Sequence, residues 1–258
     1  DLQLGKIDGD STEGIVNRYL ASLAAGVREF TLQQKRHAIS KIHLSFLGDC
    51  GEGNQSQGGN NMWRTHLTVT EQYRLFRRLE LETIDAFLPY SLETDAVTVN
   101  GNHDRVQTQQ ATRMDDGHAT EASIALADGL ALNPARYGGV RIIVPSVDEG
   151  TITYDVAEGH GEPTVMTHAH GHQWPKGQQF RWWSEQALNL QSAGAGSFLL
   201  HGHTHEFDMK SKRDRTYICV PTFEAESTYW RQLHGDVARP GAVTMITCGT
   251  EWSDLSVV

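Results

Sequence analysis

Apolar residues recur at steps of three and four between about Asp10 and Gln34, the spacing of one face of an α-helix. Asp10 or Ser11 is available to cap its start. A second helical pattern runs from about Thr70 to Leu88 and is stopped by Pro89. Each helix presents a single apolar stripe, so we expect both to cover one outer face of a sheet. The apolar positions of the first helix are Ile15, Tyr19, Leu23, Val27 and Phe30.

Short apolar runs predict strands. His43–Leu47 leads into Gly48-Asp49, and Ala96–Val99 leads into Asn100-Gly101-Asn102. A helix over about Gln179–Ser192 lies among the later strands. Alternating strands and helices followed by a strand-rich half predict an α/β fold with a more antiparallel second half. No repeat or linker interrupts the pattern, so we expect one domain over residues 1–258. The later strands are predicted near Val140–Val144, Ile152–Val156, Thr164–Thr167, Phe198–Leu200, Tyr217–Val220 and Ala242–Thr247.

The composition of the chain argues against several classes of protein. The sequence has three widely separated cysteines, Cys50, Cys219 and Cys248, which argues against a disulfide framework and for a reducing, cytoplasmic location. No apolar run approaches the ~20 residues of a membrane span, so no membrane partner is expected. The formal net charge of −10 argues against coating nucleic acid non-specifically. It leaves room for an enzyme that holds a phosphate through bound divalent metals.

Histidines gather in the second half of the chain. Seven of the thirteen fall between His160 and His205, and most follow the strand-like segments "PTVMTHAHGH" and "SFLLHGHTHEF". Residues at the carboxyl ends of strands in an open α/β sheet converge on one crevice. Imidazole is also the commonest nitrogen ligand for first-row divalent metals. The pattern Gly202-His203-Thr204-His205 therefore predicts metal ligands.

Two earlier strand ends offer oxygen ligands. Gly48-Asp49 follows "KIHLSFL", and Gly101-Asn102-His103-Asp104 follows "DAVTV". Glycine in these positions permits close backbone approach. A lone Gly-Asp is a weak signal, whereas the ordered series of strand–GD, strand–GNHD, strand–H and strand–GHxH is specific.

In this series the sequence resembles the calcineurin-like metallophosphoesterase superfamily, over essentially the whole chain. The resemblance implies a four-layer α-β-β-α sandwich of two mixed β-sheets flanked by helices. It also implies hydrolysis of phosphate esters at a site that holds two divalent metals. Asp1-Leu2-Gln3-Leu4-Gly5-Lys6 looks like the family's first block, with Gln3 where the family has histidine. The strand that should precede this block is expected to be missing.

The resemblance also implies roles for individual residues. Asp49 would bridge the two metals, His103 would donate a proton to the leaving group, and Asp104 would orient His103. Mn²⁺ is the expected metal, with Mg²⁺, Fe²⁺ or Zn²⁺ as alternatives. Gln3 either offers a hard amide oxygen to the first metal or leaves that position to water. The first metal would be held by Asp1, Gln3, Asp49 and His205, and the second by Asp49, Asn102, His203 and His168, with His170 the alternative to His168.

The substrate is less constrained. "DLQLGK" resembles the SbcD-type DNA exonuclease branch, which implies a phosphodiester substrate such as DNA and a partner nuclease subunit. "HQWPKGQQFRWW" sets Lys176 and Arg181 among aromatic residues, as a nucleic-acid groove or as a helix packing into the core. "KSKRDR", 210–215, could grip phosphate or form a solvated hairpin tip. The alternative function is a small-molecule phosphodiesterase or phosphatase, and a third is a metal-binding scaffold.

Overall fold

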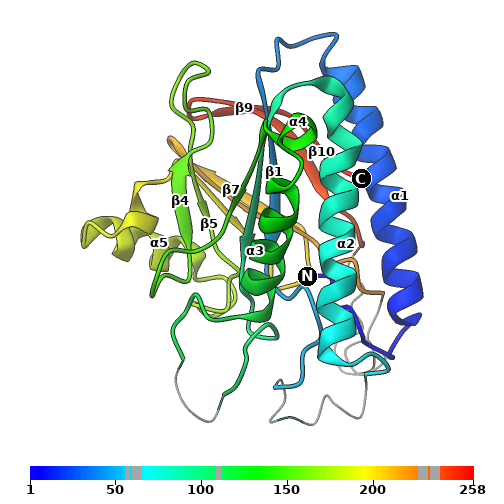
Figure 1. Cartoon of the computed structure of the whole chain (residues 1–258). Coiled ribbons are helices and arrows are strands. Elements are labelled where there is room, and N and C mark those ends of the chain that lie inside the picture. Colours follow the sequence, from blue (N-terminus) through cyan, green and yellow to red (C-terminus); the bar gives the residue numbers. More distant parts are fainter. Residues whose placement is uncertain (56–58, 60–64, 109–111, 226–231, 233–238) are drawn as a thin grey trace.

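The computed structural model describes residues 1–55, 59, 65–108, 112–225, 232 and 239–258. Within them the elements form four layers (Figure 1). Helices α1 (Ser11–Gln33), α2 (Val69–Phe87) and α3 (His118–Ala131) cover one side, and α5 (Gln179–Leu188) lies on the opposite side. Two β-sheets are packed between them. The predicted α/β class and layered arrangement are confirmed.

The first sheet is parallel and has the order β1-β2-β3, with β1 (Lys41–Leu47) at its edge. β2 (Glu93–Val99) lies between β1 and β3 (Val140–Ile143). Side chains of β2 alternate between its two faces. Ala96 packs towards α2 and α3, whereas Val97 and Val99 pack towards the second sheet.

The second sheet is mixed, with the order β4-β5-β6-β8-β7. β5 and β6 are parallel, as are β6 and β8, and the two outer pairs are antiparallel. A separate antiparallel hairpin is formed by β9 and β10. The more antiparallel second half was predicted. The bounds are β4 (Ile152–Asp155), β5 (Val165–His168), β6 (Phe198–His201), β7 (Asp208–Lys212), β8 (Arg215–Cys219), β9 (Val243–Cys248) and β10 (Glu251–Val257).

The two long helices pack on β1 as their apolar stripes predicted. Ile15 and Tyr19 of α1 and Phe76 of α2 share a buried cluster with Phe46. α2 starts at a capping box in which Thr68 and Glu71 bond each other's backbone amides, and it gives way to a 3₁₀ turn, η2 (Leu88–Tyr90). Asp10 precedes α1 but pairs with Arg18 instead of capping the helix through its side chain.

Among the residues described, four α-helices and β-strands were not predicted from the sequence: α3, α4 (Pro134–Tyr137), β7 and β10. The buried face of α3 includes small residues such as Ala119, Ala122 and Ser123, which give a weak apolar signal. β7 is mostly exposed, so its residues are polar. The predicted helix at 179–192 ends at Leu188, and a 3₁₀ turn, η3 (Ser192–Ala195), follows.

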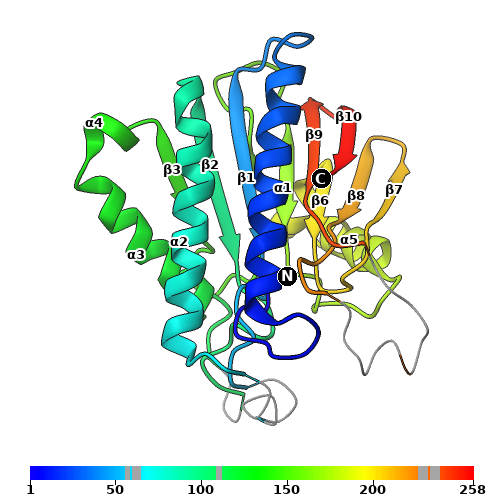
Figure 2. The same ribbon diagram turned by 90° about the vertical axis from the view of Figure 1, so that its right-hand side faces the viewer.

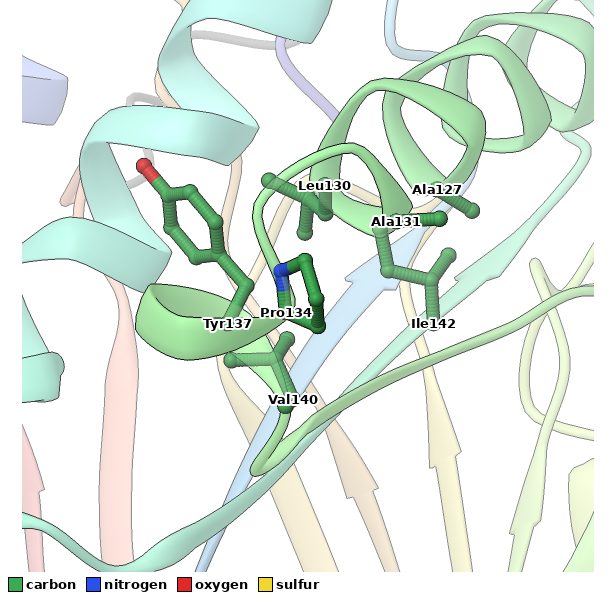
Figure 3. Close-up of a pocket in the computed structure, with 8 residues that line it drawn as sticks. Ala127, Leu130, Ala131, Pro134, Tyr137, Val140 and Ile142 are labelled. Atoms are coloured by element: carbon green, nitrogen blue, oxygen red, sulfur yellow. The ribbon is translucent and has the colours of Figure 1, made fainter.

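A small apolar pocket of about 210 Å³ lies where α3, α4 and β3 meet (Figure 3). Leu130, Pro134, Tyr137 and Val140 line it, and none of its lining residues is a predicted site residue. Tyr137 is the one polar side chain of this lining, and its hydroxyl donates to Asp85 Oδ1 at 3.0 Å. Among the helices described, none is both long and apolar enough to cross a membrane.

Candidate metal centre

The strand ends from both sheets bring three side chains together. Asp49, His170 and His203 offer ligand atoms that all lie within 4.8 Å of one another, the only such group among the residues described. Each lies two positions beyond the last residue of its strand, β1, β5 or β6. Asp49 Oδ2 is 3.1 Å from His170 Nε2, which is 3.1 Å from His203 Nδ1. This group could hold a metal ion.

Unusual backbone conformations deliver these ligands. Asp49 and His203 have φ angles of 48° and 71°, in the left-handed region that non-glycine residues seldom adopt. Gly48, at φ 84°, precedes Asp49, and a Cβ there would lie 2.6 Å from His170 Nδ1. Only glycine allows this approach of β1 to the histidine loop. Such strain is typical of functional sites.

Hydrogen bonding orients one of the two histidines, and burial keeps the other neutral. His170 Nδ1–H donates to the Leu47 carbonyl oxygen at 2.7 Å, which directs Nε2 towards Asp49. Burial, followed by the charge of His170, lowers the pKa of His203 to about 4. The His203 ring is therefore neutral at pH 7, and neutral imidazole is the ligand form.

Two further predicted ligands fit a cation because their oxygens are buried without partners. Asn102 Oδ1 and Asp1 Oδ1 have no hydrogen-bond donor among the described residues. Burying such an oxygen unpaired is costly, and a metal would satisfy it. Asp1 Oδ1 lies 3.7 Å from His205 Nε2 and 3.9 Å from His170 Nε2. Asp1 Oδ2 accepts the His203 amide at 2.8 Å, which fixes the carboxylate.

Gln3 lies beside His205, but its amide oxygen does not face the cluster. Gln3 Nε2 is 3.3 Å from His205 Nε2, and Gln3 Oε1 accepts a bond from Lys6 Nζ at 3.3 Å. Lys6 also pairs with the buried Glu224, whose other oxygen is 3.5 Å from His205 Nδ1. An ammonium group this close lowers the attraction of the first metal position for a cation.

His168 is not placed in the cluster, contrary to the first choice made from the sequence. Its Nε2 lies 2.8 Å from His43 Nε2, and its Nδ1–H donates to the Ile152 carbonyl oxygen at 3.1 Å. Both ring nitrogens are thus engaged between the sheets. His170, the alternative, holds the position beside Asp49.

Asp104 does not orient His103 as expected. Its carboxylate accepts the amides of Cys50 and Gly101, at 3.0 and 2.7 Å, and the Tyr73 hydroxyl at 2.7 Å. It therefore fastens the loop after β1 to the loop after β2. Burial, and then the nearby charge of Asp49, raise the pKa of Asp104.

His103 is oriented instead by Glu52. Its Nδ1–H donates to the Glu52 carbonyl oxygen at 3.0 Å, so Nε2 is directed towards Asp49 Oδ2, 3.9 Å away. The His103 amide donates to Asp49 Oδ1 at 2.8 Å. Glu52 and Glu224 are buried carboxylates that the sequence patterns missed. Glu52 lies three residues after Asp49 and could have been noticed on that ground, whereas Glu224 has no such signal.

The segments that suggested nucleic-acid binding have other partners. Trp174 and Trp183 are buried against Leu199 and Tyr217 beneath α5. Lys176 pairs with Glu206. The basic run 210–215 spans the turn between β7 and β8. The packing supplies no open aromatic groove in this region.

Comparisons with known proteins give overall likenesses only. No family model matches the sequence, and no curated protein matches it. Solved structures of similar shape include Chaetomium thermophilum Vps29, at 11% identity and a TM-score of 0.38, covering 81% of this chain and 82% of that one. A predicted phosphoesterase from Streptococcus pneumoniae TIGR4 has 9% identity and a TM-score of 0.35, covering 80% and 79%. An archaeal phosphodiesterase has 15% identity and a TM-score of 0.36, covering 84% and 99%.

Proposed function

We propose that the chain is a metal-dependent phosphoesterase that hydrolyses a small-molecule phosphodiester, such as a nucleotide or cyclic nucleotide. The observation that supports this most is the group Asp49, His170 and His203, drawn from both sheets, with the unpartnered oxygens of Asp1 and Asn102. A divalent cation held there would supply positive charge to polarise a phosphoryl group. Mn²⁺ remains the expected ion.

His103 would donate a proton to the leaving group, and Asp49 would position His103. Hydrolysis forms a bond from water oxygen to phosphorus and breaks the bond to the leaving oxygen. The attacking water gives up one proton, and the leaving oxygen takes one up. His103 Nε2–H is the candidate donor, because the Glu52 carbonyl fixes the ring through Nδ1. Asp49 positions the His103 backbone through Oδ1, while Oδ2 faces His170.

A small substrate is favoured over DNA by the surroundings of the site. The aromatic residues near α5 pack inside the protein. Arg181 is bonded to Glu185, and Lys176 to Glu206, so both cations are already neutralised. The chain as a whole is acidic, which weakens attraction to a long phosphate backbone.

A substrate panel tests the proposal. The metal-depleted protein is reloaded with Mn²⁺ and assayed on bis-para-nitrophenyl phosphate, cyclic nucleotides, phosphomonoesters and linear DNA. We expect metal-dependent turnover of a small diester, lost in His203→Ala. The matched control is His160→Ala, because His160 pairs with Glu93 at the opposite end of β2. Bound metal without turnover of any substrate would contradict the proposal and leave a metal-binding scaffold. Preferred cleavage of DNA would instead support the interpretation of the protein as a nuclease.

A further inference from the structure

Four side chains close a ring of polar contacts beside the metal centre. Lys6 Nζ pairs with Glu224 Oε1 and donates to Gln3 Oε1 at 3.3 Å. Gln3 Nε2 is 3.3 Å from His205 Nε2, and His205 Nδ1 is 3.5 Å from Glu224 Oε2. Each side chain therefore faces two others of the group. We call Lys6, Gln3, His205 and Glu224 the Lys6 ring.

The fold holds the two halves of the Lys6 ring together. The first residues of the chain lie beside the segment that follows β8 (Figure 2). The Phe223 amide donates to the Asp1 carbonyl oxygen at 3.1 Å, and the Thr222 hydroxyl donates to the same oxygen at 3.0 Å. Thr222 Oγ1 also accepts the Glu224 amide at 3.0 Å. These bonds place the Glu224 carboxylate opposite Lys6.

The direction of each hydrogen bond in the ring follows from the charge of Lys6. An ammonium group only donates, so the Gln3 amide turns its oxygen to Lys6 and its NH₂ group to His205. The NH₂ group also only donates, so His205 Nε2 accepts through its lone pair. In the neutral imidazole the proton then lies on Nδ1, on the side of Glu224. The lone pair that a metal would need is thus already used.

A cation at the first metal position would have to disrupt this ring. The Lys6–Glu224 pair is largely buried, with 15% and 4% of the two side chains exposed. Breaking a buried ion pair is costly, because each charge is left without a partner away from water. The ammonium also repels any other cation at this distance. The ring therefore opposes metal binding through both its hydrogen bonds and its charge.

The remaining ligands can all serve one ion. Two ligand atoms of the same ion, each bonded at about 2.1 Å, lie up to about 4.2 Å apart. Asp49 Oδ2 is 3.1 Å from His170 Nε2, and Asp1 Oδ1 is 3.9 Å from the same nitrogen. Asp1 can therefore reach the ion that His170 holds, and its unpartnered oxygen requires no second metal.

We propose that the Lys6 ring takes the place of the first metal, so that the protein binds a single divalent cation at Asp49, His170 and His203. The Lys6 ammonium supplies the positive charge that a first metal would add at this end of the site. The proposal rests on the metal centre of the proposed function, but it concerns the number of bound ions and does not depend on turnover.

Lys6→Met tests the proposal by removing the ammonium while keeping a long side chain. It leaves the buried Glu224 carboxylate unpaired beside His205, which creates a demand for a cation. We expect one Mn²⁺ per chain in wild type and two in Lys6→Met, counted by native mass spectrometry and by calorimetric titration. Electron paramagnetic resonance should show an isolated ion in wild type and magnetic coupling in the variant, because paired metals lie about 3.5–4 Å apart.

Two controls and a second variant complete the test. Lys6→Arg keeps the charge, and Lys176→Met removes a lysine whose pair with Glu206 is exposed, so both should bind one ion. Lys6→Gln also removes the charge and replaces Lys6→Met if that variant does not fold, as judged by circular dichroism. Two coupled ions in wild type, or one ion in every folded variant, would overturn the inference alone. A wild type that binds no ion would refute the proposed function as well.

Discussion

Glu80 is a buried acid whose ionisation should destabilise the fold as the pH rises. Its side chain on α2 is fully buried and is bonded by Ser123 Oγ at 3.0 Å and by Thr98 Oγ1 at 3.3 Å. Burial raises its pKa from the usual 4.5 to about 7, and the two hydroxyl bonds only partly oppose this. Neither partner carries a charge that could stabilise the carboxylate.

The direction in which stability changes with pH depends on whether the folded or the unfolded state holds the proton. Below about pH 4.5 the acid is protonated in both states and has no effect on the pH dependence. Between pH 4.5 and 7 the folded state keeps the proton and the unfolded state loses it, so stability falls as the pH rises. Above pH 7 the cost is constant. At 1.36 kcal/mol for each pH unit, the difference between these pKa values gives a cost on the order of 3 kcal/mol.

Glu80→Gln removes this cost while keeping the size of the side chain. The amount by which its free energy of unfolding exceeds that of wild type should be about 2 to 3 kcal/mol larger at pH 8 than at pH 5. Urea unfolding at the two pH values measures this. Glu82→Gln is the control, because Glu82 lies two residues along α2 and is exposed. An equal effect of Glu80→Gln at both pH values would refute the reasoning.

Three further predictions concern the metal centre. His103→Ala should keep the metal content and lower kcat by ~10²–10⁴-fold for poor leaving groups. The loss should be smaller for para-nitrophenolate, and an equal loss for both would exclude a proton donor. His170→Ala should lower metal binding in calorimetric titration, whereas His168→Ala should not. The opposite result would reverse their assignment. Gln3→His should raise affinity at its position and move preference from Mn²⁺ towards Zn²⁺. Unchanged titrations would place Gln3 outside the coordination shell.

Much of the fold followed from apolar periodicity, because the long helices and buried strands carry strong patterns. The edge strand β7 was not predicted. Its side chains are mostly exposed to solvent, so they are polar and show no apolar pattern. The β10 strand is also largely half-buried or exposed. Whether such segments form strands depends on tertiary contacts, and a single sequence does not show these contacts.

The site was predicted unevenly for a similar reason. Asp49 and His203 could be placed because Gly48-Asp49 and Gly202-His203-Thr204-His205 are motifs that follow strand-like segments. No comparable motif marked the histidine after β5, and this strand ends one residue beyond its predicted end, at His168 itself. The resemblance implied that Asp104 orients His103, whereas its carboxylate accepts the backbone amides of Cys50 and Gly101. Side-chain direction in an irregular loop depends on such long-range partners.

The origin of the ligands has a mechanical consequence. Asp49 follows a strand of the first sheet, whereas His170 and His203 follow strands of the second. All three cysteines are free, so no disulfide joins the two sheets. A cation bound by all three would act as a cross-link between the sheets. The affinity of the site for the cation would then depend on the relative position of the two sheets. Sliding one sheet over the other would release the ion. Cys50 and Gly101, which are tied together through Asp104, would move together during that displacement.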